Sequence, residues 1–186
     1  GDGGWTGTAD AYGTNATAEQ RAAACRAAFL DPQEVPGMVH CLLVRHPQGT
    51  LMVDTGCGSL FGPGAGRVLE HLGGLGLGAE DVDHVLLTHL HPDHVGGVLG
   101  DRAAAVLPNA TFHVAAPELA FWSGAPALPR TQVDEAMKDT MRQAAEGAIG
   151  AIAARTARFT PGDELLPGLS TIPLPGHTPG HVGLMV

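Results

Sequence analysis

Four potential metal ligands lie within six consecutive residues near the middle of the chain. Residues 89–94 have the sequence His-Leu-His-Pro-Asp-His, directly after a compact apolar run. Because His89 and His91 are separated by one residue, an extended backbone points both imidazoles to the same side, where they can reach one ion. The proline that follows interrupts a regular strand, so Asp93 and His94 can face a second ion nearby. The spacing predicts a metal centre.

A polar loop at the end of a strand, with histidines hydrogen-bonded to the backbone, is the alternative interpretation of residues 89–94. It suits a lone histidine better than this group. Crowding several potentially cationic imidazoles without an ion would be costly, because buried charge is unfavourable unless it is compensated. The metal site is therefore the favoured interpretation.

A second histidine motif lies 80 or more residues downstream. Residues 175–181 have the sequence Pro-Gly-His-Thr-Pro-Gly-His, again directly after an apolar run. Alone, this segment could be an ordinary turn between two strands. Paired with the upstream motif, His177 supplies a third imidazole, and three histidines with one open position are typical of catalytic rather than structural zinc. A third motif, Leu-Met-Val-Asp-Thr-Gly at residues 51–56, would on its own be a strand followed by an Asx-type turn.

The elements that must position these motifs alternate between strands and helices. A capping box at Thr17 and Gln20 predicts a helix over 17–30. Three further helices are expected: a short one that ends near residue 72, one over 117–122 and one over 131–154. The apolar runs predict strands at 38–44, 50–53, 84–88, 111–114, 157–160, 169–174 and 181–186. Because 38–44 and 50–53 form a hairpin, we expect a mixed sheet with helices packed on one face.

The composition disfavours two classes of binding partner, membranes and nucleic acids. The chain has 186 residues, 44% of them hydrophobic, which fits one domain with a sizeable core. No apolar run approaches the roughly 20 residues needed to span a bilayer, and residues 1–13 do not resemble a signal peptide, so no membrane partner is expected. Ten Lys and Arg residues in a chain of net charge −9 form no basic stripe, which disfavours nucleic acid. A small, neutral or modestly charged substrate suits this surface better.

The cysteines carry no pattern of their own. The three thiols lie at wide spacings without a Cys-x-x-Cys pair, so we expect free, buried or partly buried side chains. Five further histidines are interpreted as ordinary surface or packing residues; these are His40, His46, His71, His84 and His113.

Together and in this order, the three motifs resemble those of the metallo-β-lactamase superfamily. The resemblance runs from about residue 39 to the end of the chain. It implies an α+β fold, the αββα sandwich of that family, as a single domain over residues 1–186. It also implies a binuclear zinc hydrolase. The ligands it implies are His89, His91 and His177 for the first ion and Asp93 and His94 for the second, supported by Asp54, Thr88 and His181, which orient ligands without binding metal.

Within the superfamily, the chain most resembles the methyl-parathion-hydrolase-like branch. The segments 61–63 (Phe-Gly-Pro), 121–122 (Phe-Trp) and 166–169 (Leu-Pro-Gly-Leu) carry this likeness. In that branch an aromatic residue at the position of Trp122 lines the substrate pocket, and Phe121 is expected beside it. The alternative for Trp122 is an ordinary core or interface residue.

The chain departs from the family pattern at its C-terminal end. The family continues to a Gly-Asp turn, whose aspartate bridges both metals, and to a further histidine, whereas the present sequence stops at Val186. The first site is therefore expected to be complete, and the second to have only Asp93 and His94. The fold is expected to be incomplete, as in a fragment, a proteolysed chain or one part of a split protein. Its last strand would need a complementing C-terminal segment or a second copy of the chain.

The chemistry that follows is metal-assisted hydrolysis. Zinc lowers the pKa of bound water from 15.7 to about 7, so a metal-bound hydroxide, held on the side of Asp93 and His94, could attack an ester-like centre. No serine or cysteine has a recognisable nucleophile motif around it. The first hypothesis is a hydrolase of phosphotriesters or related small esters. A lactonase, thioesterase or β-lactamase is the second, and a non-catalytic metal-binding module or fragment of a split protein is the third. The compartment stays undecided.

Overall fold

Two β-sheets lie face to face in the computed structural model, which describes residues 1–13, 15–99, 106–129, 131 and 133–186. The larger sheet has the strand order β3-β4-β5-β6-β7. Its first pair is an antiparallel hairpin and the other pairs are parallel, so the predicted mixed sheet is confirmed. Its strands are β3 (Leu42–His46), β4 (Gly49–Val53), β5 (His84–Leu87), β6 (Thr111–Ala115) and β7 (Thr156–Phe159). The smaller, antiparallel sheet contains β8 (Glu164–Leu166), β9 (Leu169–Pro173) and β10 (Val182–Met185).

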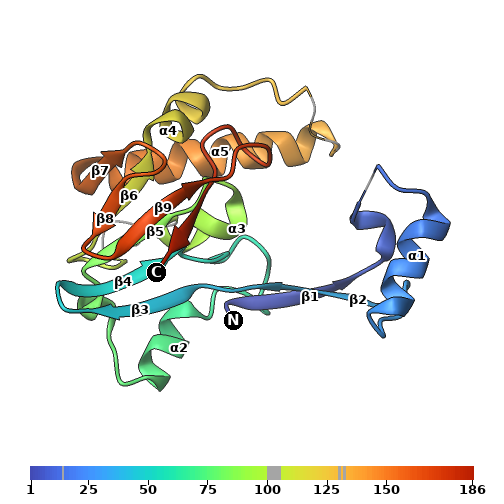
Figure 1. Cartoon of the computed structure of the whole chain (residues 1–186), viewed down its shortest axis with the longest axis horizontal. Coiled ribbons are helices and arrows are strands. Elements are labelled where there is room, and N and C mark those ends of the chain that lie inside the picture. The colour runs from blue at the N-terminus through green and yellow to red at the C-terminus, as the bar shows by residue number, and fades with distance from the viewer. Residues whose placement is uncertain (14, 100–105, 130, 132) are drawn as a thin grey trace.

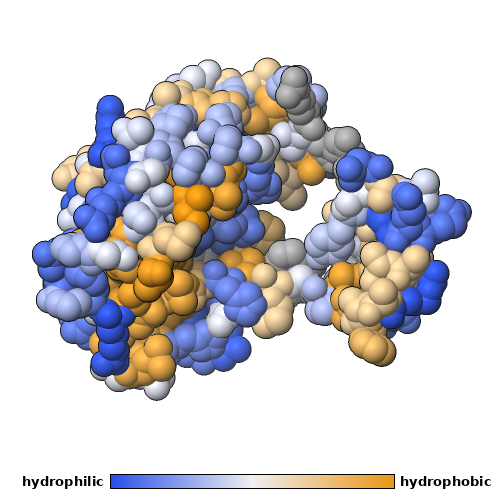
Figure 2. Space-filling view, in the orientation of Figure 1, coloured by the Kyte–Doolittle hydropathy of each residue, from blue (hydrophilic) through white to orange (hydrophobic). Residues whose placement is uncertain are grey.

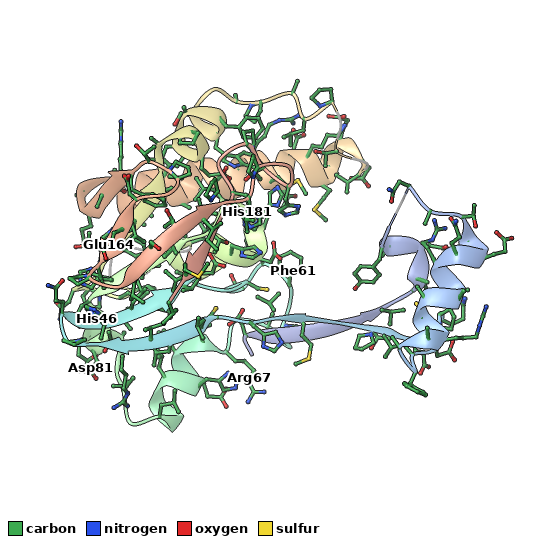
Figure 3. All side chains as sticks on the ribbon, in the orientation of Figure 1. His46, Phe61, Arg67, Asp81, Glu164 and His181 are labelled. Carbon is green, nitrogen blue, oxygen red and sulfur yellow. The ribbon has the colours of Figure 1, made fainter. Side chains whose placement is uncertain are left out.

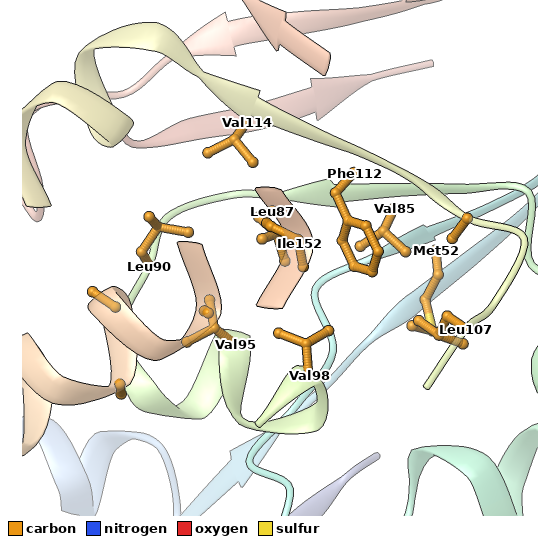
Figure 4. Close-up of a cluster of buried hydrophobic side chains, with 14 of the residues drawn as sticks. Met52, Val85, Leu87, Leu90, Val95, Val98, Leu107, Phe112, Val114 and Ile152 are labelled. Carbon is orange, nitrogen blue, oxygen red and sulfur yellow. The ribbon is translucent and has the colours of Figure 1, made fainter. Parts of the chain in front are cut away.

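Helices cover one face of the five-stranded sheet, as the sequence predicts (Figure 1). Strand residues alternate between the two faces, and Met52, Val85, Leu87 and Phe112 point to the helix side, where they form the larger core (Figure 4). The longest of these helices, α5, contributes Ile152 to this core. The helices are α2 (Val68–Gly74), α3 (Pro92–Val95), α4 (Ala116–Ser123) and α5 (Glu135–Ile152).

The opposite face of the larger sheet packs on the smaller sheet. Leu51, Leu86 and Phe159 form a second core with Leu169 and Val182. The order of layers is therefore helix, sheet, sheet, which corresponds to three of the four layers of the expected sandwich. No second helical layer occurs among the residues that the structure describes. The central strand β5 is buried on both faces, because Val85 and Leu87 face one core and Leu86 the other.

An N-terminal arm extends from this body. It consists of β1 (Gly3–Gly7), a short 3-10 turn (Ala9–Ala11), α1 (Ala18–Ala27) and β2 (Val35–Val39), with β1 and β2 antiparallel. The predicted capping box is confirmed, and α1 has no buried residue. In the space-filling view an opening separates much of α1 from the body (Figure 2). Asp2 attaches the arm to the body, because its buried carboxylate accepts hydrogen bonds from the backbone N–H groups of Cys57, Gly66 and Val68.

Two predicted elements differ most from the structure. The run 38–44 is not one strand: β2 ends at Val39 and β3 begins at Leu42, since each pairs with a different partner. The long helix begins at Glu135 rather than near residue 131, because the Asp134 side chain caps it by accepting the Met137 N–H. Residue 132, within the predicted helix, lies outside the described residues. The sequence interpretation also missed β1 and β8.

The three cysteines are free, as expected. Burial raises the pKa of the Cys41 and Cys57 thiols to about 12, so neither is an activated nucleophile. Within the described part of the chain, no helix is both long and apolar enough to cross a bilayer.

Two histidines on adjacent strands lead us to predict that the fold loses stability as the pH falls. His84 Nδ1 on β5 lies 3.2 Å from His113 Nε2 on β6. Burial, and then the neighbouring His84, lowers the pKa of His113 to about 4. Because this lies below the ordinary value near 6.5, the unfolded chain binds the proton more readily. The contribution of the neutral His113 ring to the free energy of unfolding is therefore present above about pH 6.5 and is lost as the pH falls towards 4.

We therefore expect His113→Gln to be less acid-sensitive than the wild type. Since the side chain is partly solvated, the wild type should lose about 1–3 kcal/mol more unfolding free energy than the variant between pH 7.5 and pH 4. Urea denaturation at both pH values measures the difference. His71→Gln on the solvent side of α2 is the control, and an equal acid-induced loss in wild type and His113→Gln would contradict the prediction.

Candidate metal centre

Three imidazoles from two distant loops converge at one end of the larger sheet. β5 ends at Leu87, and in the loop that follows Leu90 points into the helix-side core. His89 and His91 flank Leu90 in the chain, and both rings lie in the group of three. His89 Nε2 is 3.1 Å from His91 Nδ1, which is 3.0 Å from Nε2 of His177, in the loop between β9 and β10. The three ligand atoms all lie within 4.8 Å of one another.

The chemistry of these donors fits a divalent cation. Burial lowers the pKa of His89 and His91, that of His91 to about 4, so both rings are neutral at pH 7. Burial likewise lowers the pKa of His177. The single in-plane lone pair or proton of His91 Nδ1 cannot point at both neighbouring nitrogens. An ion between the rings would instead accept one lone pair from each, which is the ligand set typical of zinc.

Asp93 and His94 lie beside this group on the short helix α3. His94 Nε2 is 3.3 Å from an Asp93 carboxylate oxygen, and the ring centroids of His94 and His89 are 4.0 Å apart. Burial acts to lower the pKa of His94, but hydrogen bonds to Asp54 and Asp93 raise it to about 10. The pair offers two potential ligand atoms for a second ion, which would have to displace the Nε2 proton of His94. Among the described residues, no group of three forms around them.

Asp54 and Thr88 orient these rings. Asp54 is 5% exposed, and its carboxylate accepts hydrogen bonds from the Thr88 N–H, the Thr88 hydroxyl and His94 Nδ1. The Thr88 Oγ1 also lies 3.1 Å from His89 Nδ1. Because the Nδ1 atoms of both histidines are engaged in this way, their Nε2 atoms are left to face the site. The supporting role that the resemblance implies for Asp54 and Thr88 stays a prediction, and these contacts are the geometry on which it would rest.

His181 lies close to the group without joining it. Its ring centroid is 4.9 Å from that of His89 and 5.7 Å from that of His177. The five histidines interpreted as ordinary also stay outside the group of three. His46, for example, contacts the Pro167 carbonyl through Nε2 and lies at the far end of the sheets from His181 (Figure 3).

A cavity of about 330 Å³ opens beside His91 and His177. Phe121 and Trp122 both line it. Trp122 is nevertheless only 4% exposed, and its ring centroid lies 5.5 Å from that of His91. Trp122 is thus a buried residue with one side on the cavity, and its role in lining a substrate pocket stays a prediction.

The sequence interpretation missed one buried residue of the site, Glu118 on α4. An acid in the first turn of a helix is ordinary, because it favours the helix dipole. Nothing in the local pattern distinguishes Glu118 from Glu19 or Glu135, which also lie in the first turn of their helices.

Comparisons with known proteins agree with this geometry. A family model for the metallo-beta-lactamase superfamily matches residues 35–186. A probable metallo-hydrolase of Mycobacterium tuberculosis is 30% identical over 173 residues, covering 80% of this chain and 52% of that protein. The uncharacterized protein YobT of Bacillus subtilis is 26% identical over 148 residues, covering 79% and 56%. The chain thus spans about half the length of these curated relatives.

Solved structures show the same fold. The dizinc quorum-quenching lactonase AidC superposes with a TM-score of 0.87 at 24% identity, over 98% of this chain and 64% of that one. The hydrolase AbOPH, described as a member of the beta lactamase superfamily, superposes with a TM-score of 0.78 at 30% identity, over 97% and 62%. The likeness to AidC includes the N-terminal arm, because almost the whole chain is covered.

Proposed function

The chain belongs to the metallo-β-lactamase superfamily, and from that premise we propose that it is the metal-binding part of a hydrolase of small neutral lactones or related esters. The observation that carries the proposal is the convergence of His89, His91 and His177 beside a cavity. Such a combination of concave pocket and ligand cluster is the usual location of an active site.

In the proposed enzyme, His89, His91 and His177 hold the first zinc ion, while Asp93 and His94 contribute to the second. When bound, zinc polarises a carbonyl oxygen and lowers the pKa of a coordinated water from 15.7 to about 7. The protein's own contribution is orientation. Asp54 and Thr88 fix the rings of His89 and His94, and the largely buried Trp122 shields one side of His91 from water.

The cavity supports a neutral substrate. Its described lining includes Phe121, Trp122, Leu128 and Pro129, and no Lys or Arg. Apolar side chains predominate in this described lining, and the net charge of −9 disfavours anionic substrates at long range. Its volume lies at the lower end of the range for ligand pockets. A lactone or ester with a short apolar substituent fits these properties.

Solved neighbours provide an analogy for the lactone. AidC was solved with the product N-hexnoyl-L-homoserine, and another neighbour is a quorum-quenching N-acyl homoserine lactone lactonase, at 20% identity. At these identities the likeness shows the fold alone, and one fold hosts many substrates. The phosphotriester hypothesis, and the closer likeness to the methyl-parathion-hydrolase-like branch, stay predictions that the same assay tests.

The test is an assay of the zinc-loaded protein, both as this chain and as the product of its full gene. The substrates are N-acyl lactones with short, medium and long acyl chains, a paraoxon-type phosphotriester and a β-lactam. We expect ring opening of the short-chain lactone, loss of turnover with a chelator and recovery on adding zinc. Phosphotriester turnover without lactone turnover would replace the lactone proposal with the phosphotriester hypothesis. Tight binding of one metal ion without turnover of any substrate would favour the non-catalytic module.

A further inference from the structure

Glu118 connects the two loops that carry the three converging imidazoles. Its side chain lies on α4, directly after β6, and the residue is 0% exposed. One carboxylate oxygen, Oε1, accepts the Leu90 N–H at 3.0 Å and the Trp122 Nε1–H at 2.7 Å. The other, Oε2, accepts the Thr178 hydroxyl at 2.7 Å and the Gly180 N–H at 3.0 Å.

All four partners of Glu118 are donors. An ionised carboxylate is an acceptor only and can take two hydrogen bonds on each oxygen, so the four donors satisfy it. Among the described residues, no Lys, Arg or His forms an ion pair with Glu118. A buried carboxylate without a cationic partner is costly even when it is hydrogen-bonded. A cation in the adjacent site would offset part of this cost.

The positions of the donors give Glu118 a geometric role. Leu90 lies between His89 and His91, whereas Thr178 and Gly180 lie on the C-terminal side of His177. The second loop also passes directly against α4, because a Cβ at Gly180 would lie 2.6 Å from the Cα and Cβ atoms of Glu118. One carboxylate therefore fixes the separation between the two imidazoles of the first loop and the imidazole of the second.

We propose that Glu118 is a positioning residue that sets the affinity of the first metal site by holding the two histidine loops at a fixed separation. The proposal rests on the proposed function, since it requires that His89, His91 and His177 bind metal. It also explains the Thr and Gly of the second motif, because the Thr178 hydroxyl and the Gly180 N–H are both donated to Glu118.

Glu118→Gln separates this role from simple packing, because the substitution preserves shape and removes the charge. An amide has one acceptor oxygen and one donor NH2 group, so either orientation turns the NH2 group towards at least one N–H donor. Groups that orient metal ligands from behind typically contribute 10- to 100-fold in metal affinity, and we expect a loss of about that size for the first ion. Thr178→Val, which deletes one donor, should weaken affinity about three- to tenfold.

The experiment measures cobalt and zinc affinity of the folded, metal-free full chain by competition with a chelator, together with the visible absorption spectrum of the cobalt form. Thr171→Val is the matched control. Thr171 is another buried threonine, on β9, and its hydroxyl accepts the Gly162 N–H and donates to the Asp163 carbonyl. The control should lose stability without changing metal affinity or spectrum.

Weaker affinity and an altered cobalt spectrum in Glu118→Gln and Thr178→Val, but not in Thr171→Val, are the expected results. If Glu118→Gln does not fold, Thr178→Val against its control decides the matter. Lower thermal stability with wild-type affinity and spectrum would overturn the positioning role and leave the proposed function standing. Absence of metal binding by the wild type would overturn both.

Discussion

Replacing His89 or His177 with alanine is expected to abolish binding of the first metal ion and, with it, hydrolytic turnover. Each substitution removes one of three converging ligand atoms. Two remaining imidazoles leave zinc one ligand short of the three protein ligands typical of a catalytic site. Zinc content after gel filtration, measured per mole of folded protein, should fall from about one equivalent at this site to near zero.

Two further variants make this result specific. His71→Ala on α2 should retain wild-type zinc content, because His71 is outside the group of three. His181→Ala should weaken binding without abolishing it, since the ring of His181 contacts His89 and His177 and offers no ligand atom to the group. Unchanged zinc in the first two variants would refute the ligand assignment.

Replacing Asp54 with alanine is expected to lower the free energy of unfolding of the metal-free protein by about 3–5 kcal/mol. The substitution leaves the Thr88 N–H, the Thr88 hydroxyl and the His94 ring without their buried acceptor. It also places alanine at φ +60°, a conformation that asparagine and aspartate tolerate better. Zinc content should fall as well, because the rings lose their orientation.

Asp54→Asn separates the backbone contribution from the charge. Asparagine accepts the same φ and retains one carbonyl acceptor, so we expect a smaller loss of about 1–2 kcal/mol. Asp31→Ala, which removes an exposed carboxylate that accepts the Gln33 N–H, should leave stability unchanged within error. Urea denaturation of the four proteins gives the comparison. Equal stability of Asp54→Ala and the wild type would show that the three hydrogen bonds contribute nothing.

The parts of the site that were predictable depend on short-range geometry. On an extended backbone, His89 and His91 share a side whatever the rest of the fold does. The apolar runs before each motif likewise indicate strands, because a strand buried on both faces needs apolar residues at successive positions, as in Val85, Leu86 and Leu87. Family motifs then related the two loops, which spacing alone could not do.

The parts that were not predictable depend on distant partners. Glu118 contacts residues 28 and 60–62 positions away in the chain, so its role is invisible in any local window. β1 is glycine-rich and pairs with β2 about 30 residues later, which periodicity does not reveal. The start of α5 depends on one capping side chain, Asp134, within a segment whose pattern is otherwise helical.

The converging imidazoles are supported unequally. Two follow the central strand of the larger sheet, whose apolar residues are fully enclosed between two cores. The third is carried by the loop between β9 and β10, in which His177 is exposed while Thr178 and Gly180 are buried against Glu118. His89, by contrast, is only 2% exposed. An ion from solvent would therefore reach the group from the side of His177, the most accessible of the three rings.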